Sequence, residues 1–378
     1  MTVYIATFII LLIGAVIDFI TDKPPRVLYF LFFVWLTVLL CCRYGTGSDY
    51  FAYQYIYVNC EWQGFLQPVA SEYIHGEKGW LLLCAICHSL GIRYELFVAI
   101  IGLTDMTLLD RFIRRFCQKK VLALLIAYPT LYLTYYFSAL RQGLFISLFL
   151  AFVLQELLNH RIPQYYAGVI ILSFIHSAAL LLLVVPLFEK IDLTIKKIVI
   201  YSLMAVIVGI IIAITPIHNY LPYADRGISI AAISERAISL FIVLAITSTY
   251  YGKEEWNRLT KIVNYYSLGA LLYFVLLSSS LASSRLTAVF KVLEICIYSI
   301  VLRLEINKNT ALTFTFVLLL TTTIFFKNID SYIAQNGFPK ETTVWTYRYY
   351  SIFDKREIVH NRTNDTYVQY LINNTLLQ

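Results

Sequence analysis

The sequence predicts an all-α membrane protein, a bundle of about 11–12 transmembrane segments. The first observation is composition: 59% of the 378 residues are hydrophobic and only 14% are charged, whereas a soluble domain carries about 25% charged residues. The mean hydropathy is accordingly high, at +0.70. The second observation is that apolar runs recur along the chain, several of them near the ~20 residues that cross a bilayer as a helix. The runs cover about 3–20, 27–42, 79–90, 94–109, 121–137, 139–158, 165–188, 198–215, 237–251, 262–281, 286–303 and 310–326.

The runs define one multi-spanning domain, residues 1–326, followed by a polar, aromatic-rich tail, residues 327–378. The net charge of +7 is spread among short basic loops, which the positive-inside rule places in the cytoplasm. This spread of charge predicts no nucleic-acid partner. Loop 43–78 carries four carboxylates against two cations, so we predict that it is extracytoplasmic, together with loop 216–236. The first run has no preceding Lys or Arg and is predicted to be a retained helix rather than a signal peptide.

Simple alternation of crossings fails in two places. Both loops that flank 165–188 are basic, so this run, whose centre is polar, should cross twice or not at all. Region 79–109 should cross an odd number of times, yet its pattern indicates two helices. We therefore predict broken or re-entrant helices, which are tolerated where the backbone lines a wet cavity and commonly mark binding sites. The alternative is that the positive-inside rule misplaces one loop.

Seven cysteines lie mostly in apolar runs, which does not indicate a disulfide framework. The segment Cys84-Ala85-Ile86-Cys87-His88 matches the C-x-x-C-H pattern of c-type haem attachment. It lies inside an apolar run without a second haem signature. We interpret the match as a coincidence.

The stretch Arg43-Tyr44-Gly45-Thr46-Gly47-Ser48-Asp49-Tyr50 follows the second apolar run. Arg43 offers a planar, permanently charged fork that suits phosphate or carboxylate, and Gly45 and Gly47 allow a tight turn or close approach to a ligand. Asp49 is a candidate base, a candidate partner for Arg43, or a turn former. The alternative is ordinary loop punctuation, because Gly, Ser and Asp commonly follow an apolar run.

Ionisable side chains within or beside apolar runs are functional candidates, because their burial in lipid is costly. Arg141, followed by Gln142, begins run 139–158, His176 lies at the centre of 165–188, and Arg285 ends a serine-rich stretch. Each has a structural alternative. An arginine can snorkel to lipid headgroups, and a histidine or serine can hydrogen-bond a neighbouring helix.

The predicted topology places Arg43, Arg141 and Arg285 near one membrane face, with His176 and Asp49. Arginine forks bind phosphate in a bidentate manner, so three of them favour a multiply anionic ligand at the lipid boundary. A polyprenyl-linked pyrophosphate has this charge, a chain for the bilayer and sugars outside. The 30 tyrosines suit sugar stacking and membrane interfaces alike.

At these residues the chain resembles the EpsG family of bacterial polysaccharide polymerases, relatives of the Wzy O-antigen polymerases. The resemblance spans almost the whole chain and rests on short motifs in a fixed order. These are the Arg43–Tyr50 stretch, Glu77-Lys78-Gly79-Trp80, Arg141-Gln142, Ile175-His176-Ser177, Ser284-Arg285-Leu286 and Tyr347-Arg348-Tyr349. The chain departs from the expected pattern at Gly47-Ser48, in place of a tighter Gly-Thr-Asp-Tyr, and at Arg348, in place of a proline-flanked tyrosine.

The resemblance implies a GT-C-like glycosyltransferase of the bacterial inner membrane, with its active site facing the periplasm or exterior. It would transfer a growing glycan from undecaprenyl pyrophosphate to a hydroxyl of the next lipid-linked repeat, making O-antigen, capsule or exopolysaccharide. The resemblance implies no metal, no other cofactor and no nucleotide-sugar donor, and a flippase and a chain-length regulator are further expected partners. The residues expected to support the site are Gly45, Gly47, Tyr50, Glu77, Gln142 and Arg348.

In this chemistry the arginines would neutralise the leaving pyrophosphate, and Asp49 or His176 would take the proton of the acceptor hydroxyl. A carboxylate beside Arg43 is a weak base because the positive charge stabilises its ionised form. We therefore assign Asp49 mainly to orienting Arg43. His176 lies in a less polar stretch, which favours the neutral, proton-accepting imidazole, so we predict that His176 is the base and that the anomeric centre is inverted.

Three other classes use similar residues. A transporter or flippase of lipid-linked sugar would need the arginines and broken helices but no bond chemistry. An O-antigen ligase would share the donor, and in a membrane acetyltransferase His176 would act on an acyl donor. The ordered motifs favour the polymerase over all three.

Overall fold

The computed structural model describes residues 2–21, 25–60, 76–188, 194–216, 228–250, 256–301, 308–335, 342–362 and 366–373. The loop carboxylates Glu61 and Glu72, together with most of loop 216–236 and its His218, lie outside these residues.

The described residues form helices and contain no β-strand, only an isolated antiparallel bridge between Arg43 and Ser351. The first part of the chain forms α1 (Val3–Ile20), α2 (Arg26–Cys42), α3 (Tyr50–Val58), α5 (Lys78–Ser89), α6 (Tyr94–Phe116), α7 (Lys120–Ala127), the π-helix η1 (Tyr128–Tyr136), α8 (Leu140–Leu148), the π-helix η2 (Phe149–Val153) and α9 (Leu154–Leu158). It continues with α10 (Ile162–Ser173), the 3₁₀ helix η3 (Ser177–Phe188), α11 (Ile195–Ile214), α12 (Ile230–Tyr250), α13 (Trp256–Val275), α14 (Ser280–Val292), α15 (Glu294–Val301), α16 (Lys308–Gln335), α17 (Lys355–Asn361) and α18 (Thr366–Asn373).

Five of the described helical segments are long and apolar enough to cross a membrane. They are Val3–Ile20, Leu140–Leu158, Ile195–Ile214, Ile230–Ser248 and Thr310–Ala334. Exposed large apolar side chains cover the outer faces of such helices, for example Leu203 on α11 and Phe241 on α12. The prediction of an all-α, multi-spanning membrane protein is confirmed, while the number of 11–12 segments stays a prediction.

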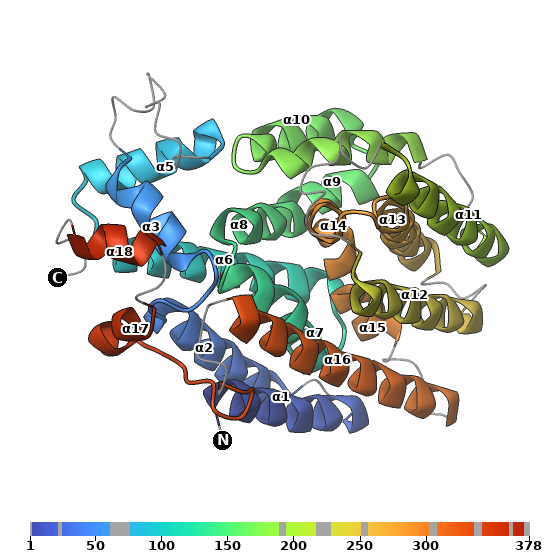
Figure 1. Cartoon of the computed structure of the whole chain (residues 1–378). Coiled ribbons are helices and arrows are strands. Elements are labelled where there is room, and N and C mark those ends of the chain that lie inside the picture. Colours follow the sequence, from blue (N-terminus) through green and yellow to red (C-terminus); the bar gives the residue numbers. More distant parts are fainter. Residues whose placement is uncertain are drawn as a thin grey trace.

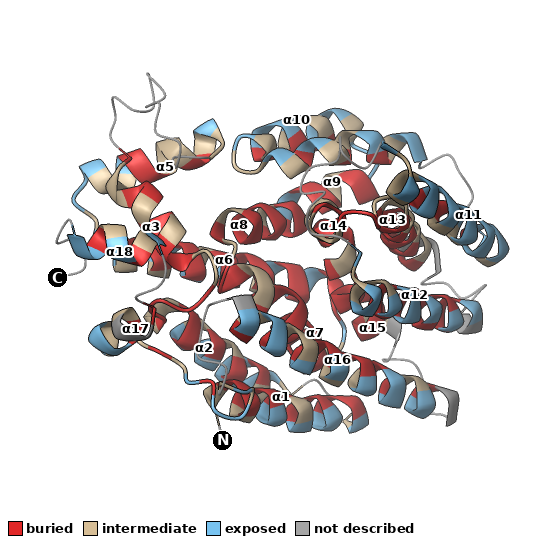
Figure 2. Cartoon of the chain, viewed as in Figure 1, coloured by how far each residue is buried: buried red, intermediate tan, exposed pale blue. Residues whose placement is uncertain are grey.

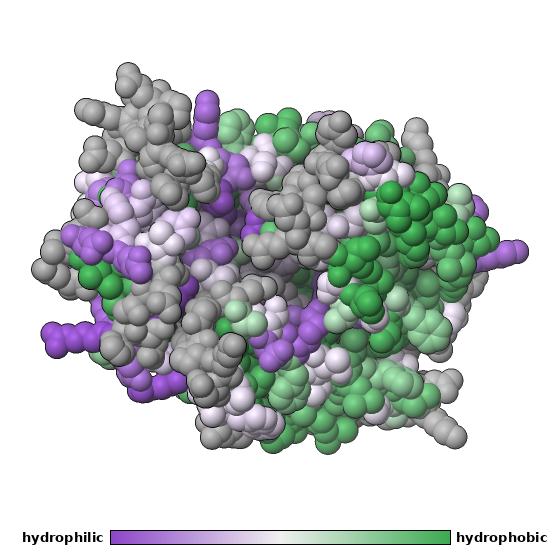
Figure 3. All heavy atoms as spheres, viewed as in Figure 1, coloured by the Kyte–Doolittle hydropathy of each residue, from purple (hydrophilic) through white to green (hydrophobic). Residues whose placement is uncertain are grey.

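The helices form a bundle with one polar end, which we call the loop end. It carries α3, α5, α17 and α18, on the left of Figure 1, and the start of α1 lies there too. Polar side chains gather on this side in the space-filling view, whereas apolar side chains cover the opposite end, over α11 and α12 (Figure 3). The chain therefore separates a polar cap from a lipid-compatible body.

The centre of the bundle is α7, whose residues from Val121 to Ala127 are all buried (Figure 2). A helix that is apolar all round belongs in a core. Asp18 of α1 fixes its start, because its Oδ2 accepts hydrogen bonds from the main-chain nitrogens of Val121 (2.8 Å) and Leu122 (3.3 Å). A carboxylate at a helix N-terminus satisfies free N–H groups and complements the helix dipole.

The predicted break near His176 is confirmed. α10 ends at Ser173, a turn covers 174–176, and a 3₁₀ helix begins at Ser177. The region 79–109 does hold two helices, and α5, with 12 residues, is ~18 Å long and too short to cross a bilayer. A further break was not predicted: run 286–303 divides at Leu293, where α14 gives way to α15.

The polar tail, predicted to start at residue 327, begins within α16, which continues to Gln335. The tail then returns to the Arg43–Tyr50 stretch. The main-chain nitrogen of Tyr44 donates to Tyr350 O (3.0 Å), and that of Ile352 donates to Cys42 O (2.9 Å). Loop and tail therefore form one packed unit at the loop end.

Candidate active site

Glu77, immediately before α5, joins three segments that are far apart in the sequence. Its Oε2 accepts a hydrogen bond from Nη1 of Arg141 at 2.6 Å. Its Oε1 accepts from the main-chain nitrogen of Ser177 at 2.8 Å and from the Ser177 hydroxyl at 2.9 Å. We call Glu77, Arg141, His176 and Ser177 the Glu77 cluster. It unites residues of three motifs recognised in the sequence.

His176 lies in the turn between α10 and η3, beside the same carboxylate. Its Nδ1 is 3.4 Å from Glu77 Oε1, and its ring centroid is 5.7 Å from that of Phe145. Both ring nitrogens are buried, and neither makes a hydrogen bond among the described residues, so the approach of Nδ1 to Glu77 is a close contact rather than a hydrogen bond. A carboxylate on one imidazole nitrogen favours the tautomer in which the other nitrogen can accept a proton. In the tautomer that carries its proton on Nδ1, Nε2 has the free lone pair.

Gly79 lets α5 approach the break at His176. The carbonyl of Phe174 accepts hydrogen bonds from the main-chain nitrogens of Gly79 (2.9 Å) and Trp80 (3.3 Å), which are otherwise unpaired at a helix start. A Cβ on Gly79 would lie 2.7 Å from that carbonyl oxygen. Close packing thus explains the Glu-Lys-Gly-Trp motif. Both the carboxylate and the start of the helix make hydrogen bonds at the break between α10 and η3.

Arg141, in the first turn of α8, pairs with Glu77 through only part of its guanidinium group. Its side chain retains 22% exposure, and its Nε lies 3.5 Å from the Tyr53 hydroxyl, with the guanidinium 5.7 Å from the Tyr53 ring. Its Nη2 has no partner among the described residues. Arg141 can therefore hold Glu77 and still offer a donor to an anion.

Burial by itself would raise the pKa of Glu77, which lies outside the candidate spans. The close contact with His176, the hydrogen bond from the Ser177 main chain and the charge of Arg141 outweigh burial and hold the pKa well below its usual range. Glu77 is therefore ionised at neutral pH.

Arg43 has a different environment from the one expected. Its side chain is buried, and Nη1 and Nη2 donate to the carbonyls of Leu40 (2.6 Å) and Tyr136 (2.7 Å). The guanidinium also lies 5.3 Å from the Phe137 ring. The expected pairing with Asp49 is absent: Asp49 makes no ion pair with Arg43. Asp49 instead lies partly exposed, immediately before α3. In this structure Arg43 joins the end of α2 to the end of η1.

Gly45 and Gly47 adopt positive φ angles of 61° and 115°, a region that favours glycine. A Cβ on Gly47 would lie 2.4 Å from the carbonyl oxygen of Phe137. Arg362 of the tail, buried in the structure, donates to the carbonyls of both glycines at 3.1 Å. The close approach is therefore to the protein itself. The sequence analysis missed Arg362, whose position in a polar tail carries no signal of burial.

The remaining predicted residues lie in other parts of the structure. Gln142 Nε2 donates to the main-chain oxygen of Arg285 at 2.8 Å, which places α14 beside α8. Tyr50 is buried, and its carbonyl accepts from the Tyr94 hydroxyl at 2.9 Å. Arg348 stays in the exposed tail, where it pairs with Glu357 at 2.7 Å.

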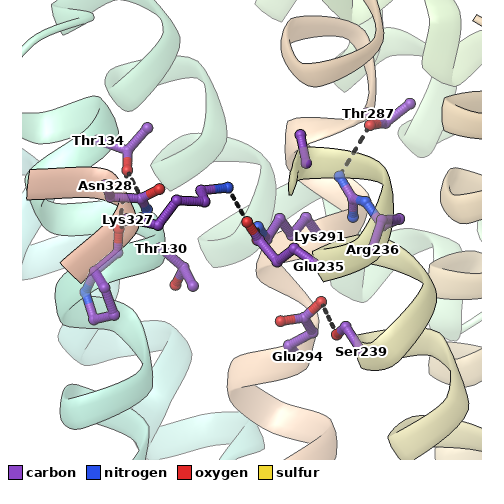
Figure 4. A network of polar contacts seen from close by, with 12 residues as sticks. Thr130, Thr134, Glu235, Arg236, Ser239, Thr287, Lys291, Glu294, Lys327 and Asn328 are labelled. Carbon is purple, nitrogen blue, oxygen red and sulfur yellow. Dashed lines mark hydrogen bonds and ion pairs between the residues drawn. The ribbon is translucent and has the colours of Figure 1, made fainter. Parts of the chain in front are cut away.

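A second polar group, also missed, lies between α12, α14 and α16 (Figure 4). Lys291 and Lys327 each form an ion pair with one carboxylate oxygen of Glu235. We call these three residues, with the adjacent Arg236, the Glu235 cluster. Lys291 stands inside an apolar run, and that placement was a signal available from the sequence.

The EpsG family model matches residues 26–348. The chain belongs to the EpsG family. The matched region contains the Glu77 and Glu235 clusters and ends before Arg362. Membership in the EpsG family implies a polysaccharide-polymerase-like function, as expected from the motifs. No curated protein and no solved structure matches the chain significantly.

Proposed function

We propose that this EpsG-family protein polymerises lipid-linked oligosaccharide repeats at the loop end, which we place on the extracytoplasmic side of the bacterial inner membrane. The observation that carries the proposal is the Glu77 cluster. Three separate motifs meet there on one carboxylate, and both ring nitrogens of His176 are buried without a hydrogen bond among the described residues. A purely structural ion pair has no need of an unpaired buried histidine.

The roles follow from this geometry. A hydroxyl of the acceptor repeat attacks the anomeric carbon of the growing chain, and the bond from that carbon to undecaprenyl pyrophosphate breaks. His176 Nε2 takes the hydroxyl proton, while Glu77 orients the ring and stabilises the imidazolium that forms. Arg141, joined by Arg285 from α14, offers positive charge to the leaving pyrophosphate. Attack opposite the leaving group inverts the anomeric centre.

Arg43 takes a bracing role in this proposal, because its two terminal nitrogens are occupied by main-chain carbonyls. Asp49 is the alternative base. It lies close enough to Tyr53 to interact with it electrostatically, as Arg141 does. Its position favours contact with the acceptor or the donor head rather than with Arg43.

The test is polymer formation by purified protein in proteoliposomes supplied with lipid-linked repeats. His176→Ala should lower turnover by about 100-fold or more while donor binding survives, and Asp49→Asn should weaken donor binding. His88, near the other end of α5 beside Tyr57, is the matched control, and His88→Ala should stay active. Arg141→Lys should also impair turnover, because an ammonium cannot make bidentate contacts.

The opposite pattern in His176→Ala and Asp49→Asn would exchange their roles. Normal polymer formation by both variants would show that neither residue acts as the base. Movement of lipid-linked repeats without bond formation would indicate a flippase. In a strain that makes lipopolysaccharide, deletion should leave single-repeat product. Complete loss of the repeat would indicate a ligase, and a full-length polymer lacking acetyl groups an acetyltransferase.

A further inference from the structure

An apolar groove opens between α12 and α16, with a volume of about 360 Å³. Its walls carry Ile238 and Ile242 from α12, and Phe316, Leu319 and Ile324 from α16. Both helices are candidate membrane spans, and Ile238 and Leu319 are more than half exposed, at 53% and 58%. The groove therefore faces the space that lipid chains occupy.

One end of the groove is charged. Glu235 and Lys327 line it, and Lys291 reaches the same carboxylate from α14, so that both lysines point at Glu235 (Figure 4). Glu235 lies five residues from the start of α12 and Lys327 eight residues from the end of α16, or ~8 and ~12 Å along the helix axes. Both charged side chains therefore lie nearer one surface of the membrane than its midplane.

The charges around Glu235 do not balance. Lys291, Lys327 and Arg236 lie near two carboxylates, Glu235 and Glu294. Glu294 is occupied by hydrogen bonds from the hydroxyls of Ser239 and Tyr266. An excess of positive charge beside an apolar groove complements a ligand with an anionic head and a long apolar chain.

Arg236 supplies an independent observation. Its side chain is buried, its Nη2 donates to the Thr287 hydroxyl at 3.2 Å, and its Nη1 has no hydrogen-bond partner among the described residues. A buried guanidinium nitrogen without an acceptor is costly. The guanidinium also lies 4.9 Å from the Tyr273 ring of α13, so this cation faces the interior between α12, α13 and α14.

We propose that the α12–α16 groove binds the isoprenoid chain of a polyprenyl phosphate lipid, with its phosphate at Lys327 and Lys291. The proposal rests on the polymerase function, which requires two lipid-linked substrates at once. The Glu77 cluster receives one phosphate head and the Glu235 cluster the other. α14 connects them, because Arg285 accepts from Gln142 and Thr287 accepts from Arg236. Phosphate displaces Glu235 from the two lysines as it binds.

The test uses the full-length protein in detergent and tritiated undecaprenyl phosphate as the probe. A benzophenone amino acid replaces Leu319 in the groove or Leu312 on the same helix. The two leucines have similar exposure, 58% and 56%, but only Leu319 lines the groove. Cross-linking should be about tenfold stronger at 319 than at 312, and equal labelling would overturn the proposal.

Competition experiments identify which part of the lipid the groove recognises. Unlabelled undecaprenyl phosphate should abolish the cross-link at 319, whereas undecaprenol, phosphatidylglycerol and inorganic phosphate at the same concentration should leave most of it. Equal competition by undecaprenol would show that the charged end is not used. Equal competition by phosphatidylglycerol would reduce the groove to a general lipid contact, and either result refutes the proposal.

Two variants separate binding from folding. Lys327→Gln should weaken cross-linking about tenfold, and Lys327→Arg, which retains the charge, should restore it. Thr323→Trp fills the groove one turn before Lys327 without removing a charge and should also block cross-linking, with the exposed Thr315→Trp on the same helix as control. Wild-type cross-linking in Thr323→Trp would exclude the groove.

The outcome is independent of the polymerase assay. Specific cross-linking without polymer would keep the lipid site and remove the proposed function, whereas polymer without cross-linking at 319 would remove only the lipid site.

Discussion

Arg43 and Arg141 stand at the edges of two apolar segments, and the sequence predicts the same ligand for both. Their surroundings differ. Arg43 is buried and donates to two main-chain carbonyls, whereas Arg141 is partly exposed and pairs with the side chains of Glu77 and Tyr53. Main-chain partners are fixed by the fold, but side-chain partners can rotate when a ligand arrives. The comparison separates an arginine that holds the structure from one that can act on a substrate.

Substitution of Arg43 should have the largest effect. Arg43→Ala removes two charged hydrogen bonds from a buried site and should lower the free energy of unfolding by about 3–5 kcal/mol, with little folded protein recovered. Thermal unfolding in detergent measures this, with Arg93→Ala, an exposed arginine before α6, as control. Normal unfolding combined with lost donor binding would instead place Arg43 on the substrate.

Gly47→Ala tests the same structural region without removing a charge. At φ 115° and with a Cβ 2.4 Å from the Phe137 carbonyl oxygen, alanine should destabilise the protein by about 3 kcal/mol. Gly91 also has a positive φ, of 70°, but nothing lies within 4 Å of its Cβ position. Gly91→Ala should therefore cost only about 1 kcal/mol, and equal losses would show that Phe137 yields to the new methyl group.

Glu77→Gln tests the Arg141 side of the comparison through pH. The pKa of Glu77 is lowered in the folded state, so its ionised form stabilises the fold above its unfolded pKa of about 4.3. The free energy of unfolding of the wild type should exceed that of Glu77→Gln by about 2 kcal/mol from pH 8 to pH 5. The difference should shrink as pH falls below 4, because the unfolded carboxylate then binds protons first. A difference that is constant to pH 3 would contradict the shift.

Arg348→Ala should have the smallest effect. Its side chain is 56% exposed and its ion pairs with Glu357 and Asp354 are in solvent, where such pairs contribute about 0–1 kcal/mol. Unfolding of the variant should nearly match that of Arg356→Ala, an exposed arginine in the same tail. A loss of several kcal/mol, or of polymer formation, would show that this tail arginine does more than cap α17.

The sequence by itself determined the fold class, the break at His176 and the motifs that assign the family. These depend on local properties. The length of an apolar run decides whether it can cross a bilayer. A polar residue in the middle of such a run needs a partner or an irregular backbone. Gly45 and Gly47 indicated a tight turn for the same reason, since only glycine adopts their φ angles without strain.

Only the tertiary structure decided which charged groups meet. Glu77 contacts residues 64 and 100 positions away, Arg362 binds carbonyls more than 300 positions away, and Lys327 reaches Glu235 across 92. The run that contains Lys291 divides at Leu293, and the hydropathy of the run gives no sign of this break. A side chain's role follows from the dielectric and the partners around it. Those are set by how the helices pack, so the roles of Arg43 and Arg141 diverged only when the chain was folded.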